Sequence, residues 1–408
     1  MKIAIPNNWF YQFLFILCIA VPYLDNFEST ISVWSLAFII TIQRKYSISL
    51  FKLVIPYILI LLIAIIVSFN YDYQKYLVIR DITYLCKPII GFFLGYQLCG
   101  KNLQNAFRLI VKTGAFIAGC HILVILNAIF IEGVRTVADL RFYSGYFSDY
   151  EIYTFIILLF HKDFQLDYSK KTLRILTVLV GFSAFMYLAR TNFIQFIILY
   201  LAVKGYFVIN KKSLVIISSI LITSVVGYLI VVSTNPRRGA EGFEGFLYKI
   251  KVAPMEPFKT KINREDYKDF NDNYRSYENI LTVRQVTREG AIPTIFGKGI
   301  GSQIDLKQEV WLGDMNLRYI SILHNGFMIV FLKSGLLGIF IYLFTIIYFF
   351  RKSKTDLPIV SNINLLFLGT GVFLFVSNWV FLGFYNLTET KSILIGFLIA
   401  YRAKINHQ

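Results

Sequence analysis

The residues best suited to chemistry in this sequence are one histidine and several arginines around a long polar segment. His324 stands beside Asn325, where that segment gives way to an apolar one. An imidazole accepts or donates a proton near neutral pH, and a guanidinium group donates two hydrogen bonds at once to a phosphate or diphosphate. These residue types indicate proton transfer and the binding of a phosphorylated molecule. A lone histidine is often structural, so that interpretation also stays open.

A helix is predicted over residues 264–289, ending at Gly290 and Pro293. Its apolar positions have the three- and four-residue spacing of one helix face: Tyr267, Phe270, Tyr274, Tyr277 and Leu281. The same rhythm continues to Arg284 and Arg288. We therefore expect the buried face to end in two guanidinium groups that share a cavity and bind an anion. The alternative is that both arginines favour the helix macrodipole and extend outward.

The amino-acid composition indicates whether the protein is soluble or lies in a membrane. Of the 408 residues, 56% are hydrophobic and 16% are charged, against about 45–50% and about 25% in soluble proteins. With a mean hydropathy of +0.60, the chain is expected to lie in a lipid bilayer. The net charge of +17 is scattered between apolar runs, which argues against nucleic acid as a partner. The four cysteines form no C-x-x-C pair, so neither a zinc site nor a disulfide framework is expected.

The apolar runs predict an all-α polytopic membrane protein with about twelve transmembrane helices. The runs lie near residues 9–24, 27–42, 53–69, 84–99, 113–131, 146–160, 174–189, 191–209, 214–233, 320–350, 358–380 and 391–401. Several are shorter than the roughly 20 residues that cross a bilayer, and the runs at 146–160 and 391–401 fit least well. No small-residue cleavage site follows the first run, so it is interpreted as a span and not as a signal peptide.

Charges in the connecting loops predict the orientation. If the N-terminus is cytoplasmic, the inside loops hold the basic residues: Arg44, Lys45 and Lys52; Lys101, Arg108 and Lys112; Lys162, Lys170, Lys171 and Arg174; Lys211 and Lys212; Arg351, Lys352 and Lys354; Arg402 and Lys404. The short outside loops then hold acids such as Asp25, Asp72 and Glu132. Both ends of the chain are therefore predicted to be cytoplasmic.

Three regions follow from this topology. Residues 1–233 form the first nine spans, residues 234–319 one large extracytoplasmic loop between spans nine and ten, and residues 320–408 an interfacial helix with spans ten to twelve. The basic residues and the histidine would then gather near the outer surface: Arg80, Lys87, Arg190, Arg284, Arg288 and His324. Lys87 lies within a span, where a charge needs a partner, a wet cavity or a route to the surface.

The run at 320–350 is too long for a single span. As one helix it would measure roughly 46 Å, against a hydrocarbon core of about 30 Å. The sequence Lys-Ser-Gly at 333–335 interrupts it, so we expect an interfacial helix over 322–332 and a span over 335–350. Upstream, the glycine-rich stretch 297–301 is expected to be a flexible turn back to the membrane, because no strand–helix context supports a dinucleotide site.

One motif in this region carries a family resemblance. His324 and Asn325, followed by nine residues and then Gly335 and Gly338, fit the pattern H-[N/S/Q]-x9-G-x-x-[G/T/Y]. This pattern resembles the signature of the O-antigen ligase family, which also covers many O-antigen and exopolysaccharide polymerases. About twelve spans with the large loop between spans nine and ten are similar to that family too, so the resemblance covers most of the chain.

Two further patterns resemble the family less specifically. Arg288, ten residues and a glycine resemble the R-x10-G pattern in the large outer loop of the polymerases. Arg80 is followed by a glycine at the same spacing, which shows how common that pattern is. Arg190 resembles the arginine of a Ser-Arg pair that begins a span in the family, although Ala189 stands in the place of the serine.

The resemblance implies a C-type glycosyltransferase of the bacterial inner membrane, with its active site facing outward and with undecaprenyl-diphosphate-linked oligosaccharide as donor. Fixed cations would stabilise the departing diphosphate, and the histidine would act as base or position the acceptor. No cofactor and no metal are expected. The expected catalytic residues are His324, Arg190, Arg284 and Arg288, and the expected substrate-binding residues are Arg80, Lys87, Asn325 and Tyr277. For Tyr277, simple packing is the alternative to stacking on a sugar.

Three functions remain open at this point. A polymerase joins lipid-linked repeat units, with membrane lipid and a chain-length regulator protein as further partners. The modest loop and the R-x10-G pattern favour this function over a ligase, which transfers the finished glycan to lipid A-core or another acceptor. A flippase for lipid-linked glycans would show two similar six-span halves and no large outer loop, whereas this sequence has the loop and no such repeat.

Overall fold

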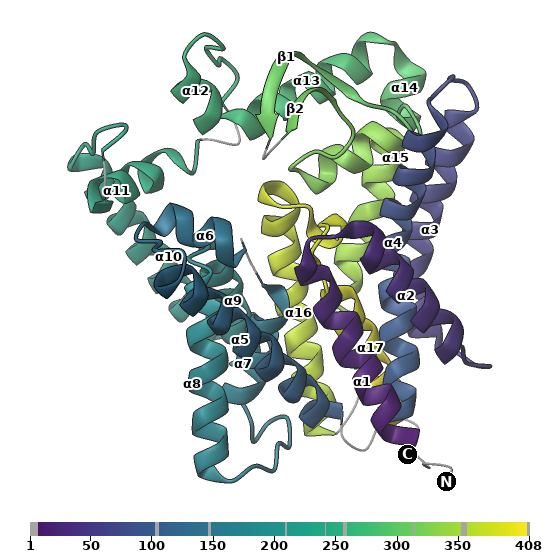
Figure 1. Cartoon of the computed structure of the whole chain (residues 1–408), viewed down its shortest axis with the longest axis vertical. Coiled ribbons are helices and arrows are strands. Elements are labelled where there is room, and N and C mark those ends of the chain that lie inside the picture. The colour runs from purple at the N-terminus through teal and green to yellow at the C-terminus, as the bar shows by residue number, and fades with distance from the viewer. Residues whose placement is uncertain are drawn as a thin grey trace.

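The computed structural model describes residues 7–102, 106–145, 148–208, 210–240, 242–255, 259–312, 315–351 and 357–405. These residues form a helical bundle with one β-hairpin (Figure 1). Among them, five helices are long and apolar enough to cross a membrane: α3 (Ile48–Ser68), α5 (Ala106–Phe130), α10 (Lys211–Ser233), α15 (Gly326–Tyr348) and α16 (Pro358–Val380). The mostly helical fold with apolar helices long enough to span a membrane agrees with the predicted class, whereas the predicted number of about twelve spans stays a prediction.

The other predicted runs also fall on helices, which are shorter or more polar. They are α1 (Asn7–Ala20), α2 (Phe27–Thr41), α4 (Lys75–Asn102), α7 (Asp149–Leu159), α8 (Lys170–Met186), α9 (Arg190–Val203) and α17 (Lys391–Ile405), with α6 (Val137–Ser144) as a further short helix. Helices α7 and α17 have 11 and 15 residues. They are therefore only about 16 and 22 Å long, less than the roughly 30 Å of a hydrocarbon core.

Polar residues stabilise the starts of α7 and α17 inside the bundle. The Ser148 hydroxyl caps α7 by accepting a hydrogen bond at 3.3 Å from the backbone N–H three residues later. The Glu389 carboxylate accepts a hydrogen bond from the first turn of α17 in the same way. Lys391 Nζ lies 2.7 Å from Asp149 Oδ2, with both side chains buried, and so joins the two helix starts. These contacts pair helix-start N–H groups and the Lys391 charge away from water, whereas Asp149 Oδ1 and Glu389 Oε2 are buried without a hydrogen-bond partner in the described residues.

Glycines bring the backbones of α4 and α17 into contact. A Cβ at Gly95 would lie 1.9 Å from the carbonyl oxygen of Ile393, and one at Gly396 would lie 2.0 Å from that of Phe92. Any larger residue at either position would have to push the two helices apart, because backbone atoms occupy the space. The contact fixes α17 against the second half of α4.

The polar segment after α10 folds into a distinct layer, here called the loop layer. It consists of α11 (Gly242–Val252), α12 (Tyr267–Asp272), α13 (Tyr274–Arg288), α14 (Ala291–Phe296), β1 (Ile304–Leu312) and β2 (Met315–Ile320). The strands pair antiparallel, with Ile304 opposite Ile320. In Figure 1 the hairpin and α12 to α14 occupy the upper end and α11 lies lower, at the left beside α10, whereas the start of α1 and the end of α17 lie at the lower end.

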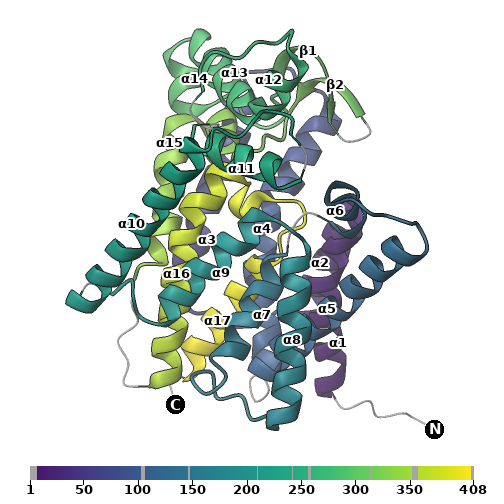
Figure 2. The ribbon, with the colours of Figure 1, turned by 90° about the vertical axis from the view of Figure 1, so that its left-hand side faces the viewer.

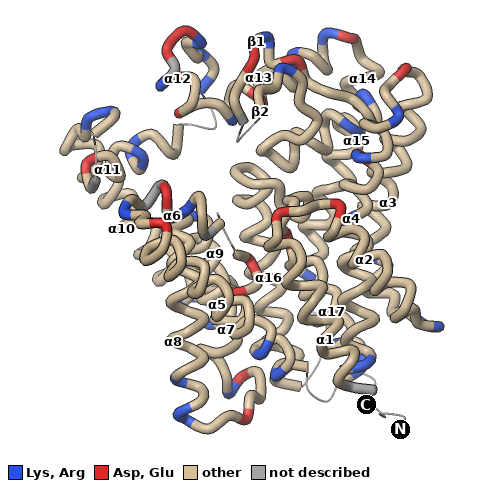
Figure 3. The backbone as a smooth tube through the Cα atoms, in the orientation of Figure 1, with Lys and Arg blue, Asp and Glu red and all other residues tan. Residues whose placement is uncertain are grey.

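Helix α10 stands apart from the other helices. None of its apolar span is buried within the chain, and it packs chiefly against α11. Figure 2 shows α10 along the flank of the bundle, below α11. Figure 3 shows charged residues at the upper and lower ends of the molecule and around α6 and α11, and few along the helices in between. That distribution is typical of a protein that spans a bilayer.

The predicted helix over 264–289 is interrupted. It forms α12 and α13, which are separated at Asn273. The Asn273 side chain donates to the carbonyl oxygen of Asp269 at 2.8 Å and so ends α12. The predicted stop at Gly290 is confirmed, since its φ is 112°, whereas Pro293 lies in the first turn of α14, where no amide donor is needed.

The predicted break in the run at 320–350 is confirmed. Gly335, with φ 66° and ψ −162°, interrupts α15, and the end of α14 approaches it so closely that a Cβ would lie 2.3 Å from the Ile295 carbonyl oxygen. The first part of α15 begins at residue 326 instead of 322. Lys352 and Lys354, two of the predicted inside charges, lie outside the described residues, as does the side chain of Tyr267.

Candidate functional site

A buried glutamate of the loop layer holds His324. The Nδ1 atom of His324 lies 3.0 Å from each carboxylate oxygen of Glu278, and the His324 backbone N–H donates to Oε2 at 3.1 Å. The Glu278 side chain is 1% exposed, whereas that of His324 is 47% exposed. The carboxylate therefore fixes the imidazole from the buried side and leaves Nε2 available to a bound molecule.

This arrangement suits a proton acceptor. A carboxylate at Nδ1 holds a proton there, so the neutral ring presents the lone pair of Nε2. When Nε2 takes up a proton, the same carboxylate stabilises the imidazolium. The ring of Tyr274 packs edge-on against His324, with centroids 5.7 Å apart. Burial raises the pKa of Tyr274, and the charge of Glu278 raises it further, so its phenol stays protonated.

Helices α13 and α15 bring the pair together. Glu278 lies on the buried side of α13, one turn after Tyr274. His324 directly precedes Asn325, whose side-chain oxygen caps α15 by accepting hydrogen bonds from two backbone N–H groups at 2.9 and 3.3 Å. Asn325, predicted to bind substrate, is 1% exposed. Its observed contacts are those of a helix cap, which fixes the chain beside the imidazole.

Arg80 reaches the same segment from α4. Its Nη2 donates to the hydroxyl of Ser321, three residues before His324, and lies 3.9 Å from Oδ1 of Asp81. The Arg80 side chain is 28% exposed, and its Nε has no hydrogen-bond partner in the part of the chain that the structure describes. The guanidinium group of Arg80 therefore contacts the segment that carries the imidazole, and its unpaired Nε is buried.

The glycine-rich turn at 297–301 anchors the loop layer on the bundle. Gly297, Gly299 and Gly301 have φ angles of 80°, 79° and 86°, which other residues rarely adopt. Backbone N–H groups of this turn donate to carbonyl oxygens of α15 and α3 at 2.7 to 3.1 Å, and that of Gly301 donates to Asp81 Oδ2 at 2.7 Å. The turn is therefore packed and hydrogen-bonded, in contrast to the flexible turn that was predicted.

A buried ion pair completes this anchor. Lys333 Nζ lies 2.6 Å from Asp81 Oδ2, and both side chains are 2% exposed. The same ammonium group donates to the carbonyl oxygen of Ser302 at 2.6 Å. Lys333 belongs to α15, two residues before the break at Gly335, and Asp81 belongs to α4. The pair therefore ties α4, α15 and the glycine-rich turn together beside Arg80.

The other three predicted arginines are exposed. Arg284 and Arg288 lie on the open side of α13, because its buried side is centred on Glu278 and Thr282. The expected burial of both guanidinium groups is therefore not observed. Arg190 is the first residue of α9 and is exposed, and α9 packs chiefly against α16 and α7. Within the described residues, no hydrogen bond or ion pair links these arginines to His324.

Two predicted substrate-binding residues are engaged within the protein. Lys87 is 1% exposed and donates to three backbone carbonyl oxygens of the segment 386–389 at 2.9, 2.6 and 2.9 Å. All three hydrogens of its ammonium group are thereby used. Tyr277 is 7% exposed, and its hydroxyl donates to the carbonyl oxygen of Leu306 at 2.5 Å. Its contacts are those of packing, the alternative to stacking on a sugar.

Sequence analysis missed Glu278, Asp81 and Lys333. For Glu278 there was a usable signal, because it follows Tyr274 by four residues and so lies near the apolar face of its helix. A carboxylate on such a face is rarely buried without a partner. Asp81 and Lys333 are 252 positions apart, and nothing local in the sequence pairs them.

Comparison with known protein families and with curated proteins finds no match to this chain.

Proposed function

We propose that this protein is a membrane glycosyltransferase of the polysaccharide repeat-unit polymerase type. It transfers a glycan from undecaprenyl diphosphate to an acceptor sugar of another lipid-linked unit, at the outer face of the bacterial inner membrane. The observation that carries the proposal is the His324–Glu278 pair, with Arg80 of α4 bound to Ser321, three residues before His324. A proton acceptor next to a guanidinium group is what transfer from a diphosphate to a hydroxyl requires.

In the proposed reaction His324, Glu278 and Arg80 have separate roles. The acceptor hydroxyl gives its proton to Nε2 of His324 as its oxygen attacks C1 of the donor sugar, and Glu278 stabilises the imidazolium. The C1–O bond breaks, and the diphosphate leaves with the electron pair. Arg80 is placed to neutralise that growing charge, which strengthens its contact in the transition state over the ground state. The exposed Arg190, Arg284 and Arg288 then serve as further contacts for the diphosphate or glycan.

The proposed topology has about twelve spans, with the loop layer outside the cytoplasm and both chain ends inside. It is supported by the position of the loop layer at the end of the bundle opposite the start of α1 and the end of α17 (Figure 1). It is supported as well by the basic residues of the predicted inside loops.

The test is transfer by the purified protein in nanodiscs, with the lipid-linked repeat unit as donor and acceptor. The wild type should form lipid-linked polymer, and His324→Ala should lower the rate by about 10²–10⁴-fold. Arg80→Ala should also lower the rate, whereas His161→Ala, at the far end of α7, serves as the matched control. Near-normal rates for both site variants would remove this site from the proposal.

Two further arms separate the alternatives. Polymer should form in the presence of EDTA, and loss of activity restored by a divalent ion would contradict a mechanism based on arginines. With lipid A-core supplied as a second acceptor, a polymerase should extend the lipid-linked chain. Transfer of preformed polymer to lipid A-core would instead assign the protein as a ligase.

A further inference from the structure

A hollow of about 320 Å³ lies where α10, α11 and α12 meet. Tyr228 and Val232 of α10, Tyr248 and Met255 on the α11 side, and Asp272 and Asn273 at the end of α12 are among its lining residues. This volume is at the lower end of the range for small-molecule sites, about 300–1,000 Å³. Two aromatic rings and a few polar groups are also the usual lining of such sites.

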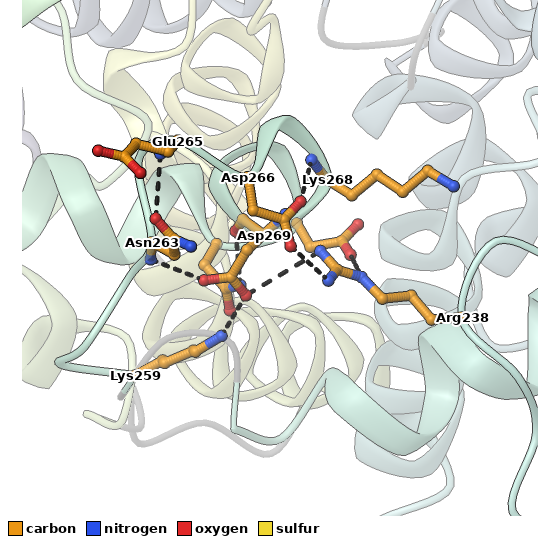
Figure 4. A network of polar contacts seen from close by, with 9 residues as sticks. Arg238, Lys259, Asn263, Glu265, Asp266, Lys268 and Asp269 are labelled. Atoms are coloured by element: carbon orange, nitrogen blue, oxygen red, sulfur yellow. Dashed lines mark hydrogen bonds and ion pairs between the residues drawn. The ribbon is translucent and has the colours of Figure 1, made fainter.

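An ion-pair network holds the polar side of this hollow in place. Figure 4 shows Arg238 reaching from the connector after α10 to the carboxylates of α12. It lies 3.2 Å from Asp266 and 3.1 Å from Asp272, and Lys259 Nζ lies 2.5 Å from Asp269. The hydrogen bond from Lys259 is the main reason that the pKa of Asp269 lies below its ordinary value. The ion pairs therefore hold these carboxylates in fixed positions.

Equal numbers of positive and negative side chains line the hollow, although Lys251 is bound to a neutral amide and not to a carboxylate. They are two lysines, Lys251 and Lys259, and two aspartates, Asp269 and Asp272. Lys259 pairs with Asp269, Asp272 pairs with Arg238, and Lys251 Nζ donates to the side-chain oxygen of Asn235 at 2.6 Å. A phosphate group favours a site with a net positive charge, whereas the two lysines and two aspartates that line this hollow sum to zero. A neutral sugar needs aromatic surface for its C–H face and fixed polar groups for its hydroxyls, and the hollow supplies both.

One lining residue of the hollow is next in sequence to a residue that contacts His324. Asn273, which lines it, is followed directly by Tyr274, and the Tyr274 ring packs against His324 at 5.7 Å between centroids. We propose that this hollow binds neutral sugar units of the polysaccharide chain, away from the end that reacts at His324. This inference rests on the proposed function, because it takes the glycan of that reaction as its ligand.

The test measures binding separately from transfer. The repeat-unit oligosaccharide is freed from its lipid diphosphate by mild acid and titrated into the purified full chain by calorimetry. Tyr248→Ala, which removes an aromatic wall, and Val252→Trp, which fills the hollow, should each weaken binding at least tenfold. Phe243→Ala, on the exposed side of the same helix, is the matched control and should bind as the wild type does. Thermal unfolding confirms that each variant is folded.

A second readout is the length of the polymer. Both hollow variants should make shorter chains than the wild type, with the first transfer close to its normal rate. Wild-type binding and wild-type chain length in both variants would overturn the proposal, and so would displacement of the oligosaccharide by inorganic pyrophosphate.

The two proposals fail in different ways. If the wild type binds the oligosaccharide through Tyr248 but transfers nothing, the proposed sugar site is supported and the proposed function is contradicted. If His324→Ala abolishes transfer while Tyr248→Ala changes neither binding nor chain length, the proposed function stands and the sugar site falls.

Discussion

At the scale of single residues, the site depends on how Glu278 is buried. The carboxylate contacts His324 through both the ring and the backbone, so it sets the position and the tautomer of the imidazole together. A buried charge of this kind is costly unless it is paired. Its role is therefore one of positioning, and it acts on the reaction through His324.

Glu278→Gln should separate this role from a purely structural one. The amide keeps the size of the side chain but cannot stabilise an imidazolium. We expect kcat for transfer to fall by roughly 10²–10⁴-fold with little change in KM, and thermal unfolding in detergent to stay near the wild type. A variant that lost its fold, or that kept full activity, would contradict the assignment of Glu278 as a positioning residue.

Lys87 illustrates the opposite case, a charge that serves the fold. Lys87→Met would leave three buried carbonyl oxygens without donors, at a cost of about 1–3 kcal/mol for each group left unpaired. We expect a lower unfolding temperature but an unchanged rate of transfer per folded molecule. A stable variant with a raised KM would instead restore Lys87 as a substrate-binding residue.

At the scale of elements, the closest packing is between α4 and α17. Gly95→Ala would place a Cβ against the Ile393 carbonyl oxygen, and forcing the helices apart should cost about 1–3 kcal/mol. Gly119→Ala, in α5, is the matched control because nothing lies within 4 Å of its Cβ position, and alanine favours a helix. The thermal unfolding temperature should fall for Gly95→Ala and should stay the same or rise for Gly119→Ala. Equal effects would show that this contact is looser than described.

The stability of the β-hairpin in the loop layer should fall at acidic pH. The hydrogen bond from Arg318 is the main cause that holds the pKa of Asp305 below its ordinary value, and Lys307 adds to it. A lowered pKa stabilises the fold above the unfolded value of about 3.9. That stabilisation is lost as the pH falls through the lower, folded value. Asp305→Asn should therefore lower unfolding temperature at neutral pH and remove this part of its dependence on acid.

At the scale of the whole molecule, the Asp81–Lys333 pair couples the loop layer to the bundle. Within the described residues, Lys333→Met alone leaves the buried Asp81 carboxylate with only Arg80 at 3.9 Å and the Gly301 N–H as partners, and it should cost up to about 3–5 kcal/mol. The double variant Asp81→Asn/Lys333→Met removes both charges and should recover part of that loss. Unfolding of the single and double variants in detergent gives the coupling energy. Purely additive effects would mean that the two residues act independently.

The break at Gly335 and the apolar helices could be predicted from the sequence, because hydropathy, helix length and glycine conformation act over a few residues. The sequence predicts less well which side of a helix is buried. The buried side of α13 is rotated by one residue from the predicted one, so that it contains Glu278 and leaves Arg284 and Arg288 exposed. Only the tertiary structure decided which charges meet. Glu278 and His324 are 46 positions apart, and Asp81 and Lys333 are 252 apart. Such pairs form when segments far apart in the sequence pack against each other, and no local sequence pattern specifies that contact.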